Sequence, residues 1–201
     1  MTSIDIPPAM PPRQTVISDL EQRTFRALLD AMARPGTIRV LPASPGAEGP
    51  WATVLTVMQS LLDHEVTFCV EADDRSVHEQ ILRRTGARSA SLDQADFVVT
   101  DAAHAAATIT AAREGDLEAP ERSATVIVRA DHVGEGATQA VLSGPGIASV
   151  VPLALDGVTA EALRALVERN AAFPNGIDTV FVDTEGRVTC LPRSTRIELE
   201  D

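Results

Sequence analysis

Lysine is absent from the 201-residue chain, and all 17 of its basic side chains are arginine. Without lysine there is no Walker A loop of the GKS/T type, whose lysine contacts nucleotide phosphates. The chain also has no lysine side chain that could form a Schiff base or anchor pyridoxal phosphate covalently. Three classes of chemistry lose their usual anchor, and we expect no cofactor.

Cysteine is scarce, with only Cys69 and Cys190 present. This number and spacing match neither a disulfide framework nor a metal site, and both residues fall in predicted strands, so we expect them to serve packing. The histidines are scattered, and none forms the i, i+4 pair of a helical metal site. These histidines are His64, His78, His104 and His132. We therefore expect no metal.

Long apolar runs are also missing, since none approaches the ~20 residues of a membrane helix. Residues 1–17 are proline-rich and lack the basic and apolar regions of a signal peptide, so we expect a flexible tail on a cytoplasmic protein. Basic residues number 17 against 29 acidic ones, and the net charge of −12 argues against a nucleic-acid surface. An anionic ligand would have to be captured by a local cluster.

What is present is the composition of a globular protein, with 44% hydrophobic and 23% charged residues. The length favours one α/β domain over residues 18–201. Helical spacing and capping patterns predict helices at residues 18–34, 51–62, 76–84, 102–113 and 159–171. Ser18 and Ser76 are the predicted caps of the first and third helices. In the first helix the apolar face is predicted to contain Leu20, Phe25, Leu28, Leu29 and Met32.

Apolar runs predict strands between these helices, at residues 37–41, 65–70, 97–100, 124–129 and 137–142. Because strands alternate with helices and several strands are apolar throughout, we expect a layered sheet with helices on both faces. A hairpin closes the chain, with strands at residues 179–182 and 188–191 joined by a short loop at residues 184–186. The hairpin makes the sheet mixed rather than purely parallel.

Polar residues flank this hairpin and form the main candidate site. Asp178 stands at its entry, and Arg193, Thr195 and Arg196 follow its exit. If the hairpin closes as predicted, the entry and the exit lie close together. A carboxylate beside two guanidinium groups could be a structural ion pair, a contact with another subunit, or an anion site with an orienting acid.

Two further candidates lie upstream. Arg34, just before a Pro-Gly pair, could hold an anion or could complement the dipole at the end of the first helix. Gly144 and Gly146, in a Ser-Gly-Pro-Gly-Ile segment, could let backbone amides approach an anion or could form a tight turn. Gly134-Glu135-Gly136 is predicted to be a turn, because Glu135 would repel a phosphate. A hydrolase is disfavoured because no G-x-S-x-G segment raises a serine.

Four segments together resemble a known family. They are Phe25-Arg26 with residues 31–36 (Ala-Met-Ala-Arg-Pro-Gly), residues 143–147 (Ser-Gly-Pro-Gly-Ile), residues 173–178 (Phe-Pro-Asn-Gly-Ile-Asp) and residues 191–196 (Leu-Pro-Arg-Ser-Thr-Arg). In order and spacing they resemble the PhnH family, a subunit of the bacterial carbon-phosphorus lyase core complex. Asn175 departs from the family pattern, where an apolar residue is more common, and the N-terminal tail is longer.

The resemblance implies a fold similar to the large domain of pyridoxal-phosphate-dependent transferases, without the cofactor lysine. It also implies a homodimer that joins other core subunits, and an assembled activity in which a phosphonate displaces adenine from a nucleoside triphosphate. No catalytic residue is carried over to this chain. Two hypotheses follow: a subunit that acts only within a complex, or a stand-alone enzyme or binder of a phosphate, phosphonate or nucleotide ligand.

Overall fold

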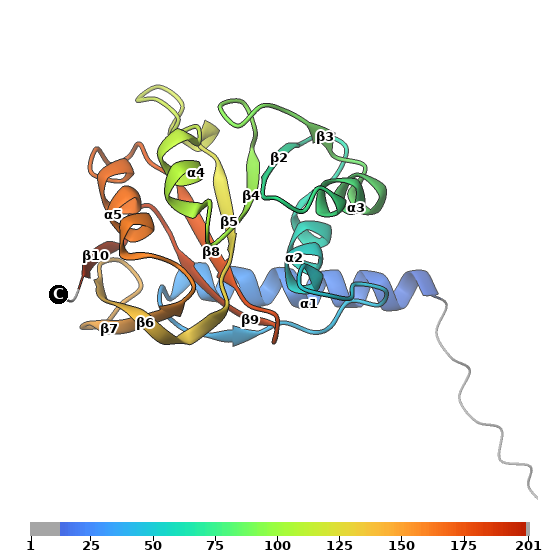
Figure 1. The fold of residues 1–201 in the computed structure, drawn as a ribbon, viewed down its shortest axis with the longest axis horizontal. Helices are drawn as coiled ribbons and strands as arrows, with labels where there is room; N and C mark the ends of the chain where they lie inside the picture. The colour runs from blue at the N-terminus through green and yellow to red at the C-terminus, as the bar shows by residue number, and fades with distance from the viewer. Residues whose placement is uncertain (1–12, 200–201) are drawn as a thin grey trace, which may run out of the picture.

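A seven-stranded mixed sheet forms the centre of the protein in the computed structural model, which describes residues 13–199, with side chains from residue 19 (Figure 1). Its strands are ordered β1-β9-β8-β5-β4-β2-β3. They span Arg39–Val40 (β1), Thr67–Glu71 (β2), Arg88–Ser89 (β3), Phe97–Asp101 (β4), Thr125–Arg129 (β5), Asp178–Val182 (β8) and Arg187–Leu191 (β9). The five strands from β3 to β8 run parallel, whereas β9 pairs antiparallel with both β8 and β1. The predicted mixed α/β architecture is thus confirmed.

Helices cover both faces of this sheet. They span Arg13–Ala33 (α1), Ala52–Leu61 (α2), Ser76–Thr85 (α3), Ala105–Ala111 (α4) and Ala160–Arg169 (α5), with a 3-10 turn at Pro120–Arg122 (η1). Along β5, Val126 and Val128 pack with α4 and α5, while Ile127 between them packs with α1, α2 and α3. Because both faces are buried, this strand is apolar throughout rather than alternating.

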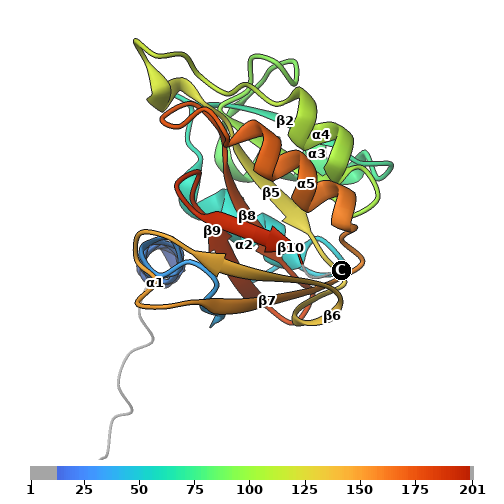
Figure 2. The ribbon, with the colours of Figure 1, turned by 90° about the vertical axis from the view of Figure 1, so that its left-hand side faces the viewer.

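A second sheet, which the sequence did not lead us to expect, has the order β10-β6-β7. It consists of His132–Ser143 (β6), Val151–Asp156 (β7) and Arg196–Leu199 (β10), all paired antiparallel. The predicted strand at residues 137–142 belongs here rather than in the main sheet. Pro152 obscures β7 in the sequence, and it is tolerated because β7 is an edge strand. Figure 2 shows this sheet beside α5 and the main sheet.

The start and the packing of α1 both differ from expectation. The helix begins at Arg13, so Ser18 lies inside it and is not its cap. Residues 1–12 of the predicted tail lie outside the described residues, and residues 13–17 are helical. Leu28 is buried as predicted, but Phe25 and Leu29 are 41% and 53% exposed. The face packed on the sheet instead includes Thr24 and Ala31, because small side chains allow close approach there.

Other expectations for single residues were met. Cys69 and Cys190 are both buried in strands, as predicted. Burial raises the pKa of the Cys69 thiol to about 11 and that of Cys190 to about 12, so both remain protonated packing residues. Within the described part of the chain, no helix is long and apolar enough to cross a membrane.

Candidate functional site

The entry and the exit of the β8–β9 hairpin lie together, as the sequence predicted. Thr179 in β8 is paired with Leu191 in β9, which places Asp178 beside the start of the segment that follows β9. The turn before β8 is held by Asn170, whose Oδ1 accepts a hydrogen bond from the backbone N–H of Ile177 at 2.8 Å. At Gly176, φ is 135°, and a Cβ atom would lie 2.3 Å from the same Asn170 oxygen. Glycine is therefore required there.

Asp178 and Arg193 form a multiply bonded ion pair. Asp178 Oδ2 accepts from Arg193 Nη2 at 2.7 Å, and Oδ1 accepts from the backbone N–H of Arg193 at 2.8 Å. The remaining Nη1 of Arg193 donates to the carbonyl oxygen of Pro120 at 2.6 Å. The two side chains are only 25% and 17% exposed. Arg193 therefore joins β8, η1 and the exit of the hairpin, and its guanidinium is already engaged.

A groove of about 740 Å³ opens beside this ion pair, between the end of α5, the connection from β6 to β7, and β10. It is lined by Gly144, Pro145, Val167, Asn170, Ala171, Phe173, Arg193, Ser194, Thr195, Arg196, Ile197 and Glu198. Phe173 is 64% exposed and Val167 39% exposed, which gives one wall an apolar surface. We call this feature the hairpin groove.

Thr195 and Arg196 differ in how far they are accessible from the hairpin groove. Thr195 is only 6% exposed, and its Oγ1 has no hydrogen-bond partner among the described residues. A buried hydroxyl without a partner is costly unless something else binds it. Arg196 is exposed at the start of β10 and forms no ion pair with another described residue. Arg196 can thus attract negative charge, while Glu198 adds a carboxylate to the same lining.

Gly144 and Gly146 occupy a turn that contacts the rest of the chain closely. Their φ angles are 125° and 81°, which favour glycine. A Cβ atom on Gly146 would lie 2.3 Å from the carbonyl oxygen of Ala33, and one on Gly144 would lie 3.0 Å from that of Ser194. The need for glycine here is accounted for by packing against α1 and the groove wall. Gly144 lines the groove, whereas Gly146 does not.

Arg34 lies apart from the groove lining, at the end of α1. Its Nη1 is 2.6 Å from Asp30 Oδ1, one helical turn earlier, and the side chain is 59% exposed. Asp30 also receives the guanidinium of Arg39. The structure therefore brings together Gly144, Arg193, Thr195 and Arg196 with Asp178 behind them, and leaves Arg34 in a separate ion-pair cluster.

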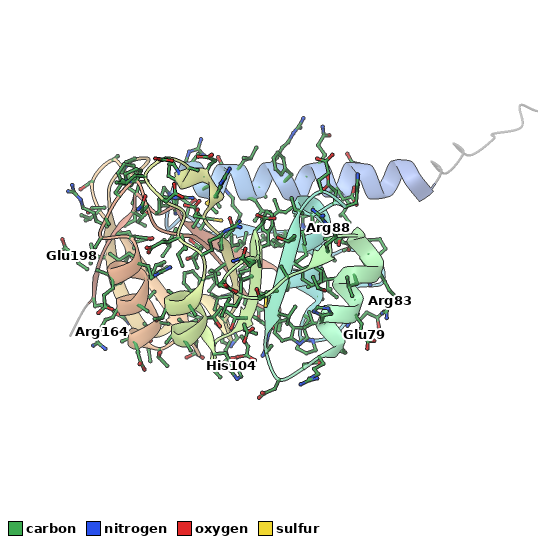
Figure 3. The ribbon with its side chains drawn as sticks, turned by 90° about the horizontal axis from the view of Figure 1, so that it is seen from above. Glu79, Arg83, Arg88, His104, Arg164 and Glu198 are labelled. Atoms are coloured by element: carbon green, nitrogen blue, oxygen red, sulfur yellow. The ribbon has the colours of Figure 1, made fainter. Side chains whose placement is uncertain are left out.

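Sequence reasoning missed a second hollow, about 580 Å³ in volume, which shares no lining residue with the hairpin groove. It is lined by Val70, Glu71, Ala72, Asp73, Arg75, His78, Glu79 and His104. In Figure 3, Glu79 lies at one end of the molecule and Glu198 of the hairpin groove at the other. The signal in the sequence is Asp101, at the end of a strand, followed three residues later by His104. This pattern is too short to be specific.

Comparison with known proteins places the chain in a family. Residues 15–198 match the model of the family described as bacterial phosphonate metabolism protein (PhnH). A Stutzerimonas stutzeri protein provisionally named C-P lyase subunit protein HtxG is 37% identical over 181 residues, which cover 90% of this chain and 87% of that protein. A second relative, from Rhizobium meliloti (strain 1021), is named alpha-D-ribose 1-methylphosphonate 5-triphosphate synthase subunit PhnH. It is 33% identical over 187 residues, which cover 89% of this chain and 90% of that protein. The chain belongs to the PhnH family.

Proposed function

We propose that this protein is a subunit of a carbon-phosphorus lyase core complex. Within it, the protein would contribute to making ribose 1-alkylphosphonate 5-triphosphate from ATP and an alkylphosphonate during organophosphonate catabolism. The observation that carries the proposal is the family match over residues 15–198, together with two relatives that are named as subunits of this kind. We also propose that the protein is cytoplasmic and that its fold is related to the large domain of pyridoxal-phosphate-dependent transferases.

The hairpin groove is the surface we assign to a neighbouring subunit. Its apolar wall at Phe173 and Val167 and the guanidinium of Arg196, which pairs with no other described residue, combine features that are enriched at protein interfaces. Arg193 is unsuited to covalent or acid-base chemistry because Asp178 and the Pro120 carbonyl hold its guanidinium. These features support a role in assembly rather than catalysis by this subunit alone.

Co-purification tests this proposal. The tagged chain should retain the other core subunits from its own organism, and the assembled complex should release adenine from ATP and methylphosphonate. The double variant Phe173→Asp/Arg196→Glu should lose the partners, whereas Arg164→Ala, an exposed arginine of α5 outside the groove lining, should keep them. Adenine release by the purified chain alone would contradict the proposal that it acts only within the complex. Unchanged co-purification of the double variant would contradict the assignment of the hairpin groove to a neighbouring subunit.

A second candidate function, a binding site for an anion in the same groove, is favoured by the exposed guanidinium of Arg196. Phosphate or methylphosphonate would be held by Ser194 and the guanidinium of Arg196. Either ligand at millimolar concentration should then raise the melting temperature, and Arg196→Ala should reduce the rise. Arg193→Ala is unsuitable here, because it would break the ion pair with Asp178. If neither anion changes the melting temperature, anion binding in the groove is contradicted, and contact with a neighbouring subunit remains as its proposed role.

We further propose that the protein forms a homodimer through exposed apolar residues at one edge of the main sheet. Two of these residues lie on α1, where Phe25 is 41% exposed and Leu29 is 53% exposed. The other two lie on or next to β1, where Ile38 is 41% exposed and Val40 is 71% exposed. We call these four residues the edge patch. Within the part of the chain that the structure describes, β1 pairs only with β9, so its other edge is open there. Large exposed apolar groups beside an open strand edge favour association with a second copy.

A further inference from the structure

The hollow near His104 lies at a special point of the main sheet. Strands β2 and β4 are parallel neighbours, but α3, which follows β2, packs on one face of the sheet and α4, which follows β4, packs on the other. When the connections from two adjacent strands leave to opposite faces, a crevice forms outside the carboxyl ends of those strands, and ligands of open α/β sheets bind there. We call this hollow the switch crevice. It is separate from the hairpin groove, and its function is independent of the function proposed above.

An imidazole is held in a defined orientation at this crevice. Asp101, the last residue of β4, accepts from His104 Nδ1 at 2.7 Å and from the His104 backbone N–H at 3.1 Å. The Asp101 side chain is 13% exposed and that of His104 is 41% exposed, so a surface imidazole is oriented by a largely buried carboxylate. The other ring nitrogen, Nε2, lies 3.7 Å from Asp73, whose side chain is 96% exposed. In the neutral ring, Nδ1–H donates to Asp101 and Nε2 is left as a hydrogen-bond acceptor toward the crevice.

The charges around the crevice select its ligand. Glu71, Asp73 and Glu79 line it, and Arg75 is the only arginine among its lining residues. Asp101 adds a fourth carboxylate beneath His104. Glu71 is held at one oxygen, where Oε1 accepts from the buried Cys69 thiol at 3.4 Å. The excess of carboxylates disfavours phosphate or phosphonate and favours a cation with N–H donors.

We propose that the switch crevice binds the primary ammonium group of a small organic cation. The ammonium would donate to Glu71, Asp73 and Nε2 of neutral His104, which together offer three acceptors for its three N–H bonds. Figure 3 shows His104 near the start of α4 and Glu79 on α3, on the same side of the molecule. The cavity of about 580 Å³ is large enough for the organic part of a small metabolite.

Proton binding to His104 should compete with this ligand. The hydrogen bond to Asp101 and the Asp101 charge raise the pKa of His104, and the charges of Asp73 and Glu71 add to the effect. The titratable and charged side chains around the ring are these three acids, together with Arg75, His78 and Glu79. Below its pKa the ring is cationic, its Nε2 carries a proton, and it repels an ammonium group. Affinity for the cation should therefore rise as the pH is raised through the pKa of His104.

Titration of the full-length protein with ethylammonium chloride, followed by calorimetry or NMR at constant ionic strength, tests the proposal. Saturable one-to-one binding is expected, tighter at about pH 8 than at about pH 6. Glu71→Gln and His104→Gln should each weaken binding about tenfold, and His104→Gln should also abolish the pH dependence. The exposed His64, outside the crevice lining, provides the control His64→Gln, which should bind as the wild type does.

Two comparison ligands separate this site from general attraction to an acidic protein. Tetramethylammonium, which has the charge but no N–H donor, should bind much more weakly than ethylammonium. Inorganic phosphate should not bind at the crevice. Equal responses to ethylammonium and tetramethylammonium, binding that survives both variants, chemical-shift changes at His104 on adding phosphate, or no saturable binding at all would each overturn the proposal.

Discussion

Arg193 and Arg196 look alike in the sequence but have different roles, because only one of them is already paired. Arg193 is 17% exposed and bonded to Asp178 and to the Pro120 carbonyl, whereas Arg196 is exposed and forms no ion pair with a described residue. The Pro120 carbonyl lies 73 positions earlier in the chain. No local pattern could reveal that contact. The sequence could therefore predict that Asp178 and the arginines meet, but not which arginine stays available.

Substitution of Asp178 tests this division of roles. In Asp178→Asn the guanidinium of Arg193 stays largely buried without a counter-charge, so the free energy of unfolding should fall by about 2 kcal/mol. Arg196→Ala should change it by less than about 0.5 kcal/mol, because it removes an exposed group that forms no ion pair within residues 19–199. Urea unfolding at neutral pH measures both values. If the free energy of unfolding fell equally in the two variants, the ion pair of Asp178 with Arg193 would contribute no more to stability than the exposed Arg196 side chain does.

At the scale of single elements, a predicted helix can be right while its predicted cap is wrong. The sequence indicated Ser76 as the cap of α3, and the helix does begin at Ser76 and ends at Gly86 in the left-handed conformation, with φ 71°. However, the free backbone N–H of Ser76 donates to Asp74 Oδ1 at 2.9 Å. Asp74 Oδ2 also accepts from Trp51 Nε1 at 3.0 Å. The acid two residues earlier thus caps α3 and links it to α2.

Asp74→Ala should therefore destabilise the protein more than Ser76→Ala. Loss of the cap and of the bond from Trp51 should lower the melting temperature by several degrees. Ser76→Ala keeps the bonds that Asp74 accepts from the Ser76 backbone N–H and from Trp51 and loses only the contact of the Ser76 hydroxyl with Asp74, so it should lower the melting temperature less. Thermal or urea denaturation gives the comparison. If Ser76→Ala lost more stability than Asp74→Ala, Ser76 rather than Asp74 would be the residue that caps α3.

Elements buried on both faces were the easiest to predict, and short elements with one exposed face were the hardest. The strands β4 and β5 are runs of apolar residues with strand propensity, and the runs themselves located these strands. In contrast, β10 spans only Arg196–Leu199 and alternates exposed and half-buried residues, so it was interpreted as the polar end of the hairpin. Its partner is β6, more than 50 residues earlier. That pairing depends on tertiary packing, and the hairpin groove beside β10 could not be foreseen without it.

At the scale of the whole molecule, two surface properties oppose one another. The net charge of −12 repels a second copy at long range, whereas the edge patch offers apolar area for contact. Salt screens the repulsion over about 10 Å at moderate ionic strength but leaves apolar burial intact. Self-association through the edge patch should thus strengthen as salt is added. An interface made of ion pairs would show the reverse dependence.

Dimer formation can be tested with charge-matched variants. Leu29→Glu and Val40→Glu each place a carboxylate in the edge patch, where burial against a second copy would be costly, so both should be monomeric in analytical ultracentrifugation. Leu117→Glu adds the same charge at a residue that is 77% exposed in the connection between α4 and η1, outside the patch, and should dimerise like the wild type. If the three variants dissociate equally, net charge rather than the patch controls association. If all three remain dimers, the interface lies elsewhere, and the open edge of β1 stays available for another subunit of the complex.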